Sequence, residues 1–127
     1  MPLVYIDYGL IEQVLHNLLL NATQHAPDGT RIRIKFFYDN GDLTIQIMDR
    51  GTGFHKSDLE FVFNKFYRGK FAKTGGTGLG LSIVKGFIEA HNGTVVAENR
   101  KNGGALFTIK IPVEISDPDS LNNQMIK

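Results

Sequence analysis

The chain has 127 residues, 42% of them hydrophobic, which is enough for one domain with a single core and hardly for two. Its 14 lysine and arginine residues nearly balance 13 acidic ones, so overall charge gives no strong attraction to nucleic acid or to an anionic membrane surface. There is no cysteine, which excludes disulfides and thiolate metal sites.

The first half of the chain predicts one helix and one β-hairpin. The opening segment "MPLVYID" is extended and has no linker before it, which suggests that more protein normally precedes it. Asp7 is a suitable N-cap, and apolar residues recur at helical spacing from Leu10 to Ala26. Asn40 and Gly41 form a strong hairpin-turn signal. Alternating apolar residues on either side of this turn predict strands at 31–38 and 43–49.

The second half predicts two further helices and a second hairpin. Ser57 can cap a short helix over 58–66, and a basic, glycine-rich loop follows it. A long helix is predicted over 79–91, with Asn92-Gly93 as its stop signal. The last two strands are predicted at 94–99 and 105–112.

This order of elements predicts an α+β fold. Two hairpins and two long helices suggest a two-layer sandwich, with a mixed sheet that carries its helices on one face. The predicted domain covers residues 1–112. Beyond it the pattern dissolves, so residues 113–127 are predicted to form a disordered C-terminal tail.

The stretch "KTGGTGLGLSIVKGF" is the most unusual part of the sequence. It lacks the Lys and Ser or Thr that follow the last glycine of a Walker A loop, because Gly80 precedes Leu81 and Ser82. It also lacks the third glycine of the dinucleotide fingerprint, where Ile83 stands. A glycine-rich run entering a helix still presents backbone N–H groups and a positive dipole end to phosphates. On this pattern alone, phosphate binding and a purely structural loop stay equally open.

Two asparagines stand four residues apart in the first predicted helix, at Asn17 and Asn21, on the border of its apolar stripe. Asparagine is a mediocre helix former, so two in mid-helix need an explanation. One interpretation is a hydrogen bond to a neighbouring loop. The other is an amide oxygen directed at Mg²⁺, a hard cation that accepts neutral oxygen ligands.

Two further stretches carry candidate ligand contacts. Asp49 ends a strand and is followed by Gly51 and Gly53, a pattern that also marks many ordinary turns. A carboxylate there could accept the exocyclic amine of adenine while the glycines let the ring approach. Lys65 and Arg68, in "FNKFYRG", could reach a terminal phosphate, whereas the aromatic residues beside them are more typical of a core.

Taken in order, "NLLLNA", "DRGTGF", "FNKFYRG" and "GGTGLGLSIVK" resemble the nucleotide-binding boxes of the catalytic ATP-binding domain of bacterial sensor histidine kinases. This family shares one ATP-binding fold, the Bergerat fold, with gyrase, Hsp90 and MutL. "AENRKNGGALFTIKIP" is similar to the last hairpin of the family, so the resemblance runs from about Leu3 to Pro112. "PLVYID" and "AENRKNGGA" look most like the potassium-sensing Kdp-type kinases.

The resemblance implies a role for each matching residue. Asn21 would be the Mg²⁺ ligand and Asn17 would support the metal and phosphates, whereas Asp49 would bind the adenine amine with Gly51 and Gly53 making room for the ring. The implied catalytic residues are Asn17, Asn21 and Arg68. The other implied nucleotide contacts are His25, Lys65, Tyr67, Arg68, Gly76, Thr77, Gly78, Leu79 and Gly80.

Two positions depart from the family pattern. Gln24 stands where a phosphate-binding Lys is common, which shifts that work to the basic residues Lys65, Arg68, Lys70 or Lys73. His25 stands where a Tyr commonly packs near the adenine, and an imidazole can still stack there.

The resemblance implies a kinase whose acceptor lies elsewhere. The superfamily's hydrolases carry a general-base Glu where this chain has Asn17, and an amide cannot take up a proton. A phosphoacceptor histidine in this family precedes an acidic residue. None of the four histidines of this chain does so, namely His16, His25, His55 and His91. The expected reaction is therefore γ-phosphoryl transfer to a histidine on a separate dimerisation domain, without autophosphorylation by this chain alone. The alternatives are an ATPase clamp domain and a non-catalytic nucleotide-binding module, which Gln24 supports.

The expected partners are that dimerisation domain and a downstream response regulator. Binding to nucleic acid is not expected. The full-length protein is expected to be anchored in the inner membrane, with this domain on the cytoplasmic side where ATP is available.

Overall fold

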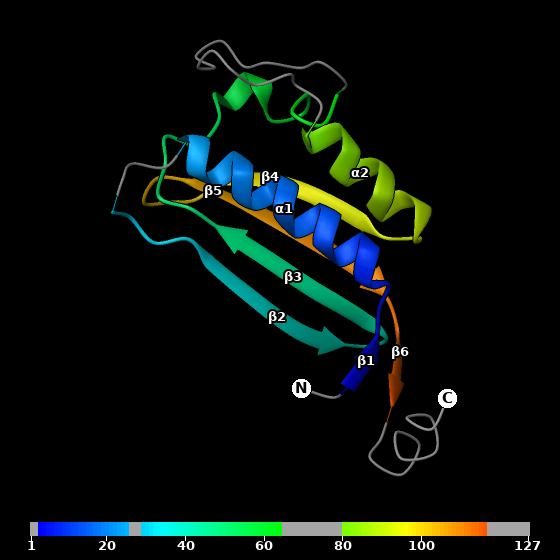
Figure 1. The fold of residues 1–127 in the computed structure, drawn as a ribbon. Coiled ribbons are helices and arrows are strands. Elements are labelled where there is room, and N and C mark those ends of the chain that lie inside the picture. Colours follow the sequence, from blue (N-terminus) through cyan, green and yellow to red (C-terminus); the bar gives the residue numbers. More distant parts are fainter. Residues whose placement is uncertain (1–2, 26–28, 65–79, 117–127) are drawn as a thin grey trace.

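The computed structural model describes residues 3–25, 29–64 and 80–116 (Figure 1). Its elements in chain order are β1 (Leu3–Tyr5), α1 (Tyr8–His25), β2 (Arg33–Asp39), β3 (Asp42–Met48), the 3-10 turn η1 (Lys56–Asp58), α2 (Gly80–Ala90), β4 (Thr94–Asn99), β5 (Ala105–Pro112) and β6 (Glu114–Ser116). No helix in this part of the chain is long and apolar enough to cross a bilayer.

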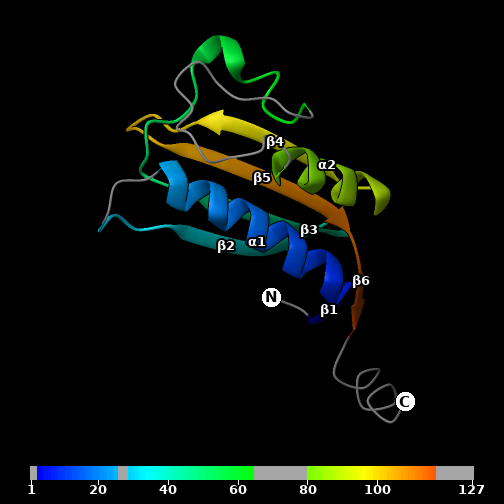
Figure 2. The ribbon, with the colours of Figure 1, turned by 45° about the horizontal axis from the view of Figure 1, so that its top comes forward.

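A four-stranded sheet in the order β2-β3-β5-β4 forms one layer, and α1 and α2 lie together on one of its faces (Figures 1 and 2). The predicted α+β sandwich with helices on one face is therefore confirmed. The sheet is antiparallel in every described pairing rather than mixed. The reason is that β5, the return strand of the second hairpin, lies between β3 and β4 and pairs antiparallel with both.

The core lies between the sheet and the two helices. In α1 every fourth residue is buried, and in β3 and β5 every second residue faces the helices, as the helical and strand periods require. The core residues are Leu10, Val14, Leu18, Leu43, Ile45, Ile47, Val84, Ile88, Ala105, Phe107, Ile109 and Ile111. The opposite face of the sheet carries no described helix, and polar residues such as Arg33 and Lys35 lie on it.

The helix boundaries follow the signals in the sequence. The Asp7 Oδ1 accepts a hydrogen bond from the Leu10 N–H at 3.0 Å, so the predicted N-cap is confirmed. At the end of α2, Asn92 adopts a left-handed backbone with φ 62°, and the Gly93 N–H bonds to the Ile88 carbonyl at 2.9 Å. Asn92-Gly93 is thus the stop predicted for this helix.

The short helix predicted over 58–66 is not formed as an α-helix. Instead η1 covers only Lys56–Asp58, with turns to residue 63, and residues 65 and 66 lie outside the described part. His55, rather than Ser57, is the N-cap, because its imidazole Nδ1 accepts from the Ser57 N–H at 3.3 Å. The His55 Nδ1 also lies 2.7 Å from the Ser57 hydroxyl oxygen. The Ser57 side chain, which was expected to cap the helix, is therefore hydrogen-bonded to His55 instead.

Regular structure continues beyond the predicted domain end at residue 112. The Val113 N–H bonds to the Gly41 carbonyl at 3.0 Å, and β6 then pairs antiparallel with β1, with Val4 opposite Ile115. This pairing joins the two ends of the described chain (Figure 1). The tail predicted over 113–127 therefore contains a strand at its start, and residues 117–127 lie outside the described part.

Candidate nucleotide-binding site

Asp49 is a buried carboxylate at the end of β3, and only 2% of the residue is exposed. Its Oδ1 accepts hydrogen bonds from the Gly51 N–H at 2.8 Å and the Ala105 N–H at 3.0 Å. Among the described residues, no group donates to its Oδ2. A buried carboxylate oxygen without a donor costs free energy, so this atom is an acceptor suited to a ligand N–H.

The second hairpin fixes the backbone of Asp49. The Asp49 N–H donates to the Ala105 carbonyl at 3.0 Å, and the Arg100 Nη1 donates to the Asp49 carbonyl at 2.8 Å. Gly104, at φ +98°, passes so close that a Cβ on it would overlap the Asp49 carbonyl oxygen. Only glycine allows both that backbone conformation and that approach.

Asn99 fixes the glycine loop that follows Asp49. Its Oδ1 accepts from the Phe54 N–H and its Nδ2 donates to the Phe54 carbonyl, both at 2.8 Å. Gly53, at φ +72°, lies against the same amide, because a Cβ there would be 2.6 Å from the Asn99 Oδ1. The Phe54 ring packs edge-on against Phe107, with centroids 5.9 Å apart. The loop therefore has a fixed shape beside Asp49.

Replacing Asn99 with Ala is expected to destabilise the domain by about 1–2 kcal/mol, because two hydrogen bonds to Phe54 are lost at a partly solvated site. Chemical denaturation measures this change. Asn102→Ala in the adjacent turn is the matched control, since Asn102 makes no hydrogen bond within the described part of the chain, and it should change stability by less than about 0.5 kcal/mol. Equal effects of the two variants would contradict this role of Asn99.

Asn17 and Asn21 lie half-buried on the C-terminal half of α1. The Asn17 Nδ2 donates to the Gln13 carbonyl one turn earlier, at 3.0 Å, so its amide bonds its own helix rather than a neighbouring loop. Its Oδ1 lies 3.6 Å from the position that a Cβ would take on Gly80, the first residue of α2. The Asn21 side chain makes no hydrogen bond to another described residue.

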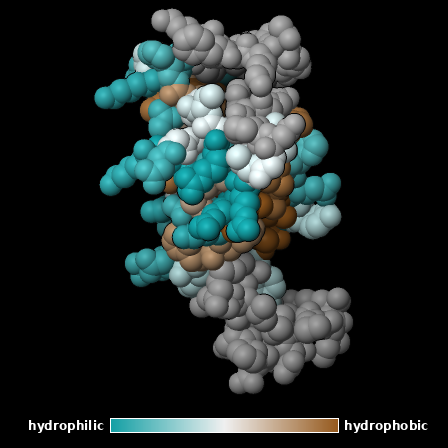
Figure 3. All heavy atoms as spheres, turned by 90° about the vertical axis from the view of Figure 1, so that its left-hand side faces the viewer, coloured by the Kyte–Doolittle hydropathy of each residue, from teal (hydrophilic) through white to brown (hydrophobic). Residues whose placement is uncertain are grey.

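The structure thus brings two pairs of predicted site residues together directly, Asn17 with Gly80 and Asp49 with Gly51. The end of α1 and the end of β3 also lie at the same end of the domain (Figure 1), where hydrophilic side chains cover much of the surface (Figure 3). The other predicted contacts fall outside what the structure describes: the His25 side chain and residues Lys65, Tyr67, Arg68, Gly76, Thr77, Gly78 and Leu79.

Sequence reasoning missed two residues that build this site, Asn99 and Gly104. Both lie in the "AENRKNGGA" segment, which predicts only a hairpin and a family resemblance. The one local signal in it is the second of its two glycines, directly before a strand. Its specific partner, Asp49, lies 55 residues earlier and could not be read from local pattern.

The buried acceptor, the glycine loop beside it and Asn17 at the start of α2 define a nucleotide-binding α+β domain. Residues 6–115 match the family described as "Histidine kinase-, DNA gyrase B-, and HSP90-like ATPase", and the chain belongs to this family. It is an ATP-binding catalytic domain of the sensor histidine kinase type, as the sequence predicted.

The sensor protein KdpD of Clostridium acetobutylicum is 40% identical over 116 residues, which cover 89% of this chain and 13% of the relative. The sensor-like histidine kinase SenX3 of Mycolicibacterium smegmatis is also 40% identical, over 93% of this chain and 31% of that relative. Among solved structures, the mycobacterial sensor histidine kinase MprB is 28% identical with a TM-score of 0.80, covering 89% of this chain and 78% of that one.

The equal identity to KdpD and SenX3 does not single out the Kdp type, which stays a prediction. The chain spans less than a third of the length of these two curated relatives.

Proposed function

We propose that this chain binds ATP with its adenine amine on Asp49 and donates the γ-phosphoryl group to a histidine on a dimerisation domain of the same full-length protein. The observation that carries the proposal is the buried Asp49 Oδ2, which has no donor within the described part of the chain. An adenine amine would supply the missing donor, and Gly51 and Gly53 present no side chain to the ring.

The phosphate end of the site is proposed between the start of α2 and the C-terminal half of α1. Gly80 begins α2, whose N–H groups and dipole favour an anion, and Asn17 lies against it. Lys65 and Arg68 are the proposed side-chain contacts to the triphosphate. The lid residues Gly76, Thr77, Gly78 and Leu79 are proposed to add backbone donors, and His25 and Tyr67 to pack near the nucleotide.

Asn21 is the proposed Mg²⁺ ligand. Its side chain is half-buried, lies one turn beyond Asn17 and makes no hydrogen bond to a described residue, so its amide oxygen is available. A neutral amide oxygen suits a hard cation that keeps several of its waters. Bound Mg²⁺ would neutralise charge that develops on the phosphates.

The local chemistry favours transfer over hydrolysis. Asn17 is an amide, and its Nδ2 is already held by the Gln13 carbonyl, so no general base for water stands at this position. Phosphoryl transfer needs mainly alignment and charge neutralisation, which the proposed contacts can provide. A downstream response regulator and membrane anchorage of the full-length protein are part of the same proposal, by analogy with the sensor proteins that the chain matches.

The Mg²⁺ role is tested by calorimetric titration of ATP with and without Mg²⁺. Mg²⁺ is expected to raise the ATP affinity of wild type. Asn21→Ala should lower ATP affinity in the presence of Mg²⁺ by about tenfold or more, which removes most of that gain, because a metal ligand is lost. Affinity without Mg²⁺ should change by less than about threefold, which is below 1 kcal/mol. Gln13→Ala, exposed on the same helix, is the matched control and should keep the full gain. An unchanged Mg²⁺ effect in Asn21→Ala would remove Asn21 as the ligand.

The transfer step is tested by mixing this chain with the histidine-containing dimerisation domain of its full-length protein and ATP labelled on the γ-phosphate. We expect label on that domain and none on this chain incubated alone. Release of labelled inorganic phosphate at the same rate with and without the acceptor would instead indicate that the chain is an ATPase clamp domain. ATP binding without either product would indicate a non-catalytic module.

A further inference from the structure

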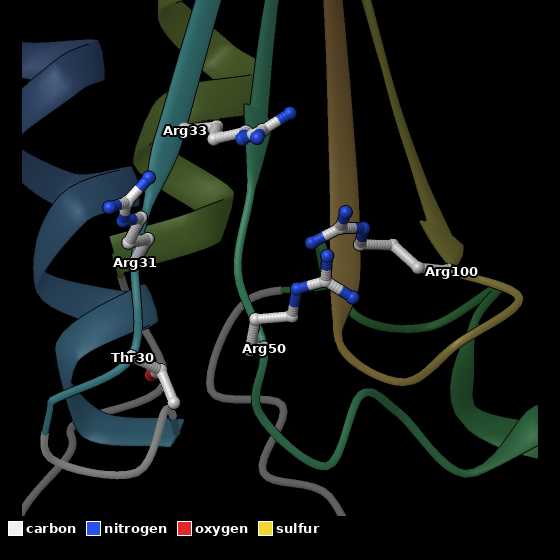
Figure 4. Close-up of a pocket in the computed structure, with 5 residues that line it drawn as sticks. All are labelled: Thr30, Arg31, Arg33, Arg50 and Arg100. Atoms are coloured by element: carbon white, nitrogen blue, oxygen red, sulfur yellow. The ribbon is translucent and has the colours of Figure 1, made fainter.

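Four arginines gather at one pocket on the face of the sheet opposite α1 and α2 (Figure 4). Its described lining consists of Thr30, Arg31, Arg33, Arg50 and Arg100. These side chains come from the start of β2 and the residues just before it, and from the segments that follow β3 and β4. Figure 4 shows Arg50 and Arg100 extending toward one another, with the helices behind the strands. The topology thus brings together cations from three separate parts of the sequence.

This concentration of positive charge is unusual for a chain whose net charge is only +1. The sequence has five arginines and nine lysines, yet four of those arginines and no lysine are in the described lining. Within the described residues, none of the four arginines makes an ion pair, and the lining holds no acidic side chain. Like charges gathered in this way repel one another, so an anion would stabilise the arrangement.

The type of cation indicates the type of anion. A guanidinium presents a planar fork of N–H donors that matches phosphate oxygens in pairs, whereas lysine acts as a point charge. Arg100 is held in place because it also donates to the Asp49 carbonyl at 2.8 Å. The pocket volume of about 180 Å³ is below the 300–1,000 Å³ typical of sites for drug-sized ligands, so a small anion fits better than a whole nucleotide.

We propose that this arginine pocket binds a small anion carrying two or more phosphate groups, either a free polyphosphate or the headgroup of an anionic lipid. The site is separate from the proposed nucleotide site. The Asp49 side chain follows the alternation of Ile45 and Ile47 toward the helices, whereas Arg33 lies on the other face of the sheet, opposite Met48. The inference stands independently of the proposed phosphoryl transfer.

Pyrophosphate titrated into the 127-residue chain by calorimetry is the direct test. Arg33→Gln/Arg50→Gln is expected to weaken binding at this site at least about tenfold, because charge-assisted hydrogen bonds are lost. Both residues are exposed, so the variant should keep the thermal stability of wild type. Lys35→Gln/Lys110→Gln is the matched control: it removes the same charge from the same sheet face outside the pocket and should weaken binding less than about threefold.

Vesicles of cardiolipin in phosphatidylcholine distinguish the two sources of phosphate, because each cardiolipin headgroup carries two phosphate groups. Sedimentation of the wild-type chain with these vesicles, lost in Arg33→Gln/Arg50→Gln and kept in the lysine control, would support a lipid headgroup. Pyrophosphate binding with no sedimentation would support a free polyphosphate. Pyrophosphate that binds the arginine variant as tightly as wild type, or that weakens equally in the lysine control, would overturn the proposal. Unchanged binding by the arginine variant would mean that pyrophosphate binds elsewhere, including at the nucleotide site. Equal weakening in the lysine control would mean that binding depends on the overall charge of the chain and not on this pocket.

Discussion

Asp49→Asn is expected to weaken ATP binding by at least about 100-fold while the domain stays folded. The Asn Oδ1 can still accept from the Gly51 and Ala105 N–H groups, so the internal hydrogen bonds survive. The substitution changes the Oδ2 atom, where an NH₂ donor replaces the acceptor. This NH₂ group would face the adenine amine, which is also a donor. Two buried donors that face each other leave both unsatisfied, which is the costly outcome.

Calorimetric titration of ATP measures this loss, and thermal unfolding checks that the variant is intact. Asp39→Asn, exposed at the end of β2, is the control for loss of one negative charge and should bind ATP as wild type does. ATP affinity of Asp49→Asn within about threefold of wild type, a difference below 1 kcal/mol, would contradict the role given to this carboxylate.

Gly104→Ala is expected to be among the most destabilising single substitutions in the chain, by about 4 kcal/mol or more. It combines strain at φ +98° with overlap between the new Cβ and the Asp49 carbonyl oxygen, and each effect alone costs about 1–3 kcal/mol. Relief of that overlap requires Asp49 to move away from the second hairpin. ATP affinity should therefore fall in the molecules that remain folded.

The neighbouring glycine provides an unusually close control. Gly103 has φ +96° but no heavy atom within 4 Å of its Cβ position, so Gly103→Ala carries the backbone strain without the overlap. We expect it to cost about 1–2 kcal/mol and to leave ATP affinity unchanged. Denaturant unfolding of the two variants measures the difference. Equal destabilisation by both would show that backbone strain alone matters and that the contact with Asp49 does not.

Local signals in the sequence were enough for most of the fold. Asp7 and Asn92-Gly93 mark helix ends through hydrogen bonds that span only a few residues, and β4 and β5 have the bounds predicted for them. The exceptions depend on distant partners. The sheet is antiparallel because β5 inserts between β3 and β4, and β6 exists because it pairs with β1, more than 100 residues earlier.

The candidate site divides in the same way. Asp49, Gly51 and Gly53 could be predicted as ligand contacts, because a carboxylate followed by glycines in the sequence directly indicates an acceptor with open space beside it. Asn99 and Gly104 did not, because their roles arise only when the second hairpin packs against the loop that follows β3. The arginine pocket was equally invisible in a sequence with nearly balanced charge.

The measurement that tests the account most directly compares ATP with inosine triphosphate, which carries a carbonyl in place of the adenine amine, in wild type and Asp49→Asn. Wild type should prefer ATP by about 100-fold, since a carbonyl oxygen would face the Asp49 Oδ2. Asp49→Asn should lose or reverse that preference, because its new NH₂ can donate to the inosine carbonyl. The same ATP preference in both proteins would contradict the claim that Asp49 recognises the adenine amine.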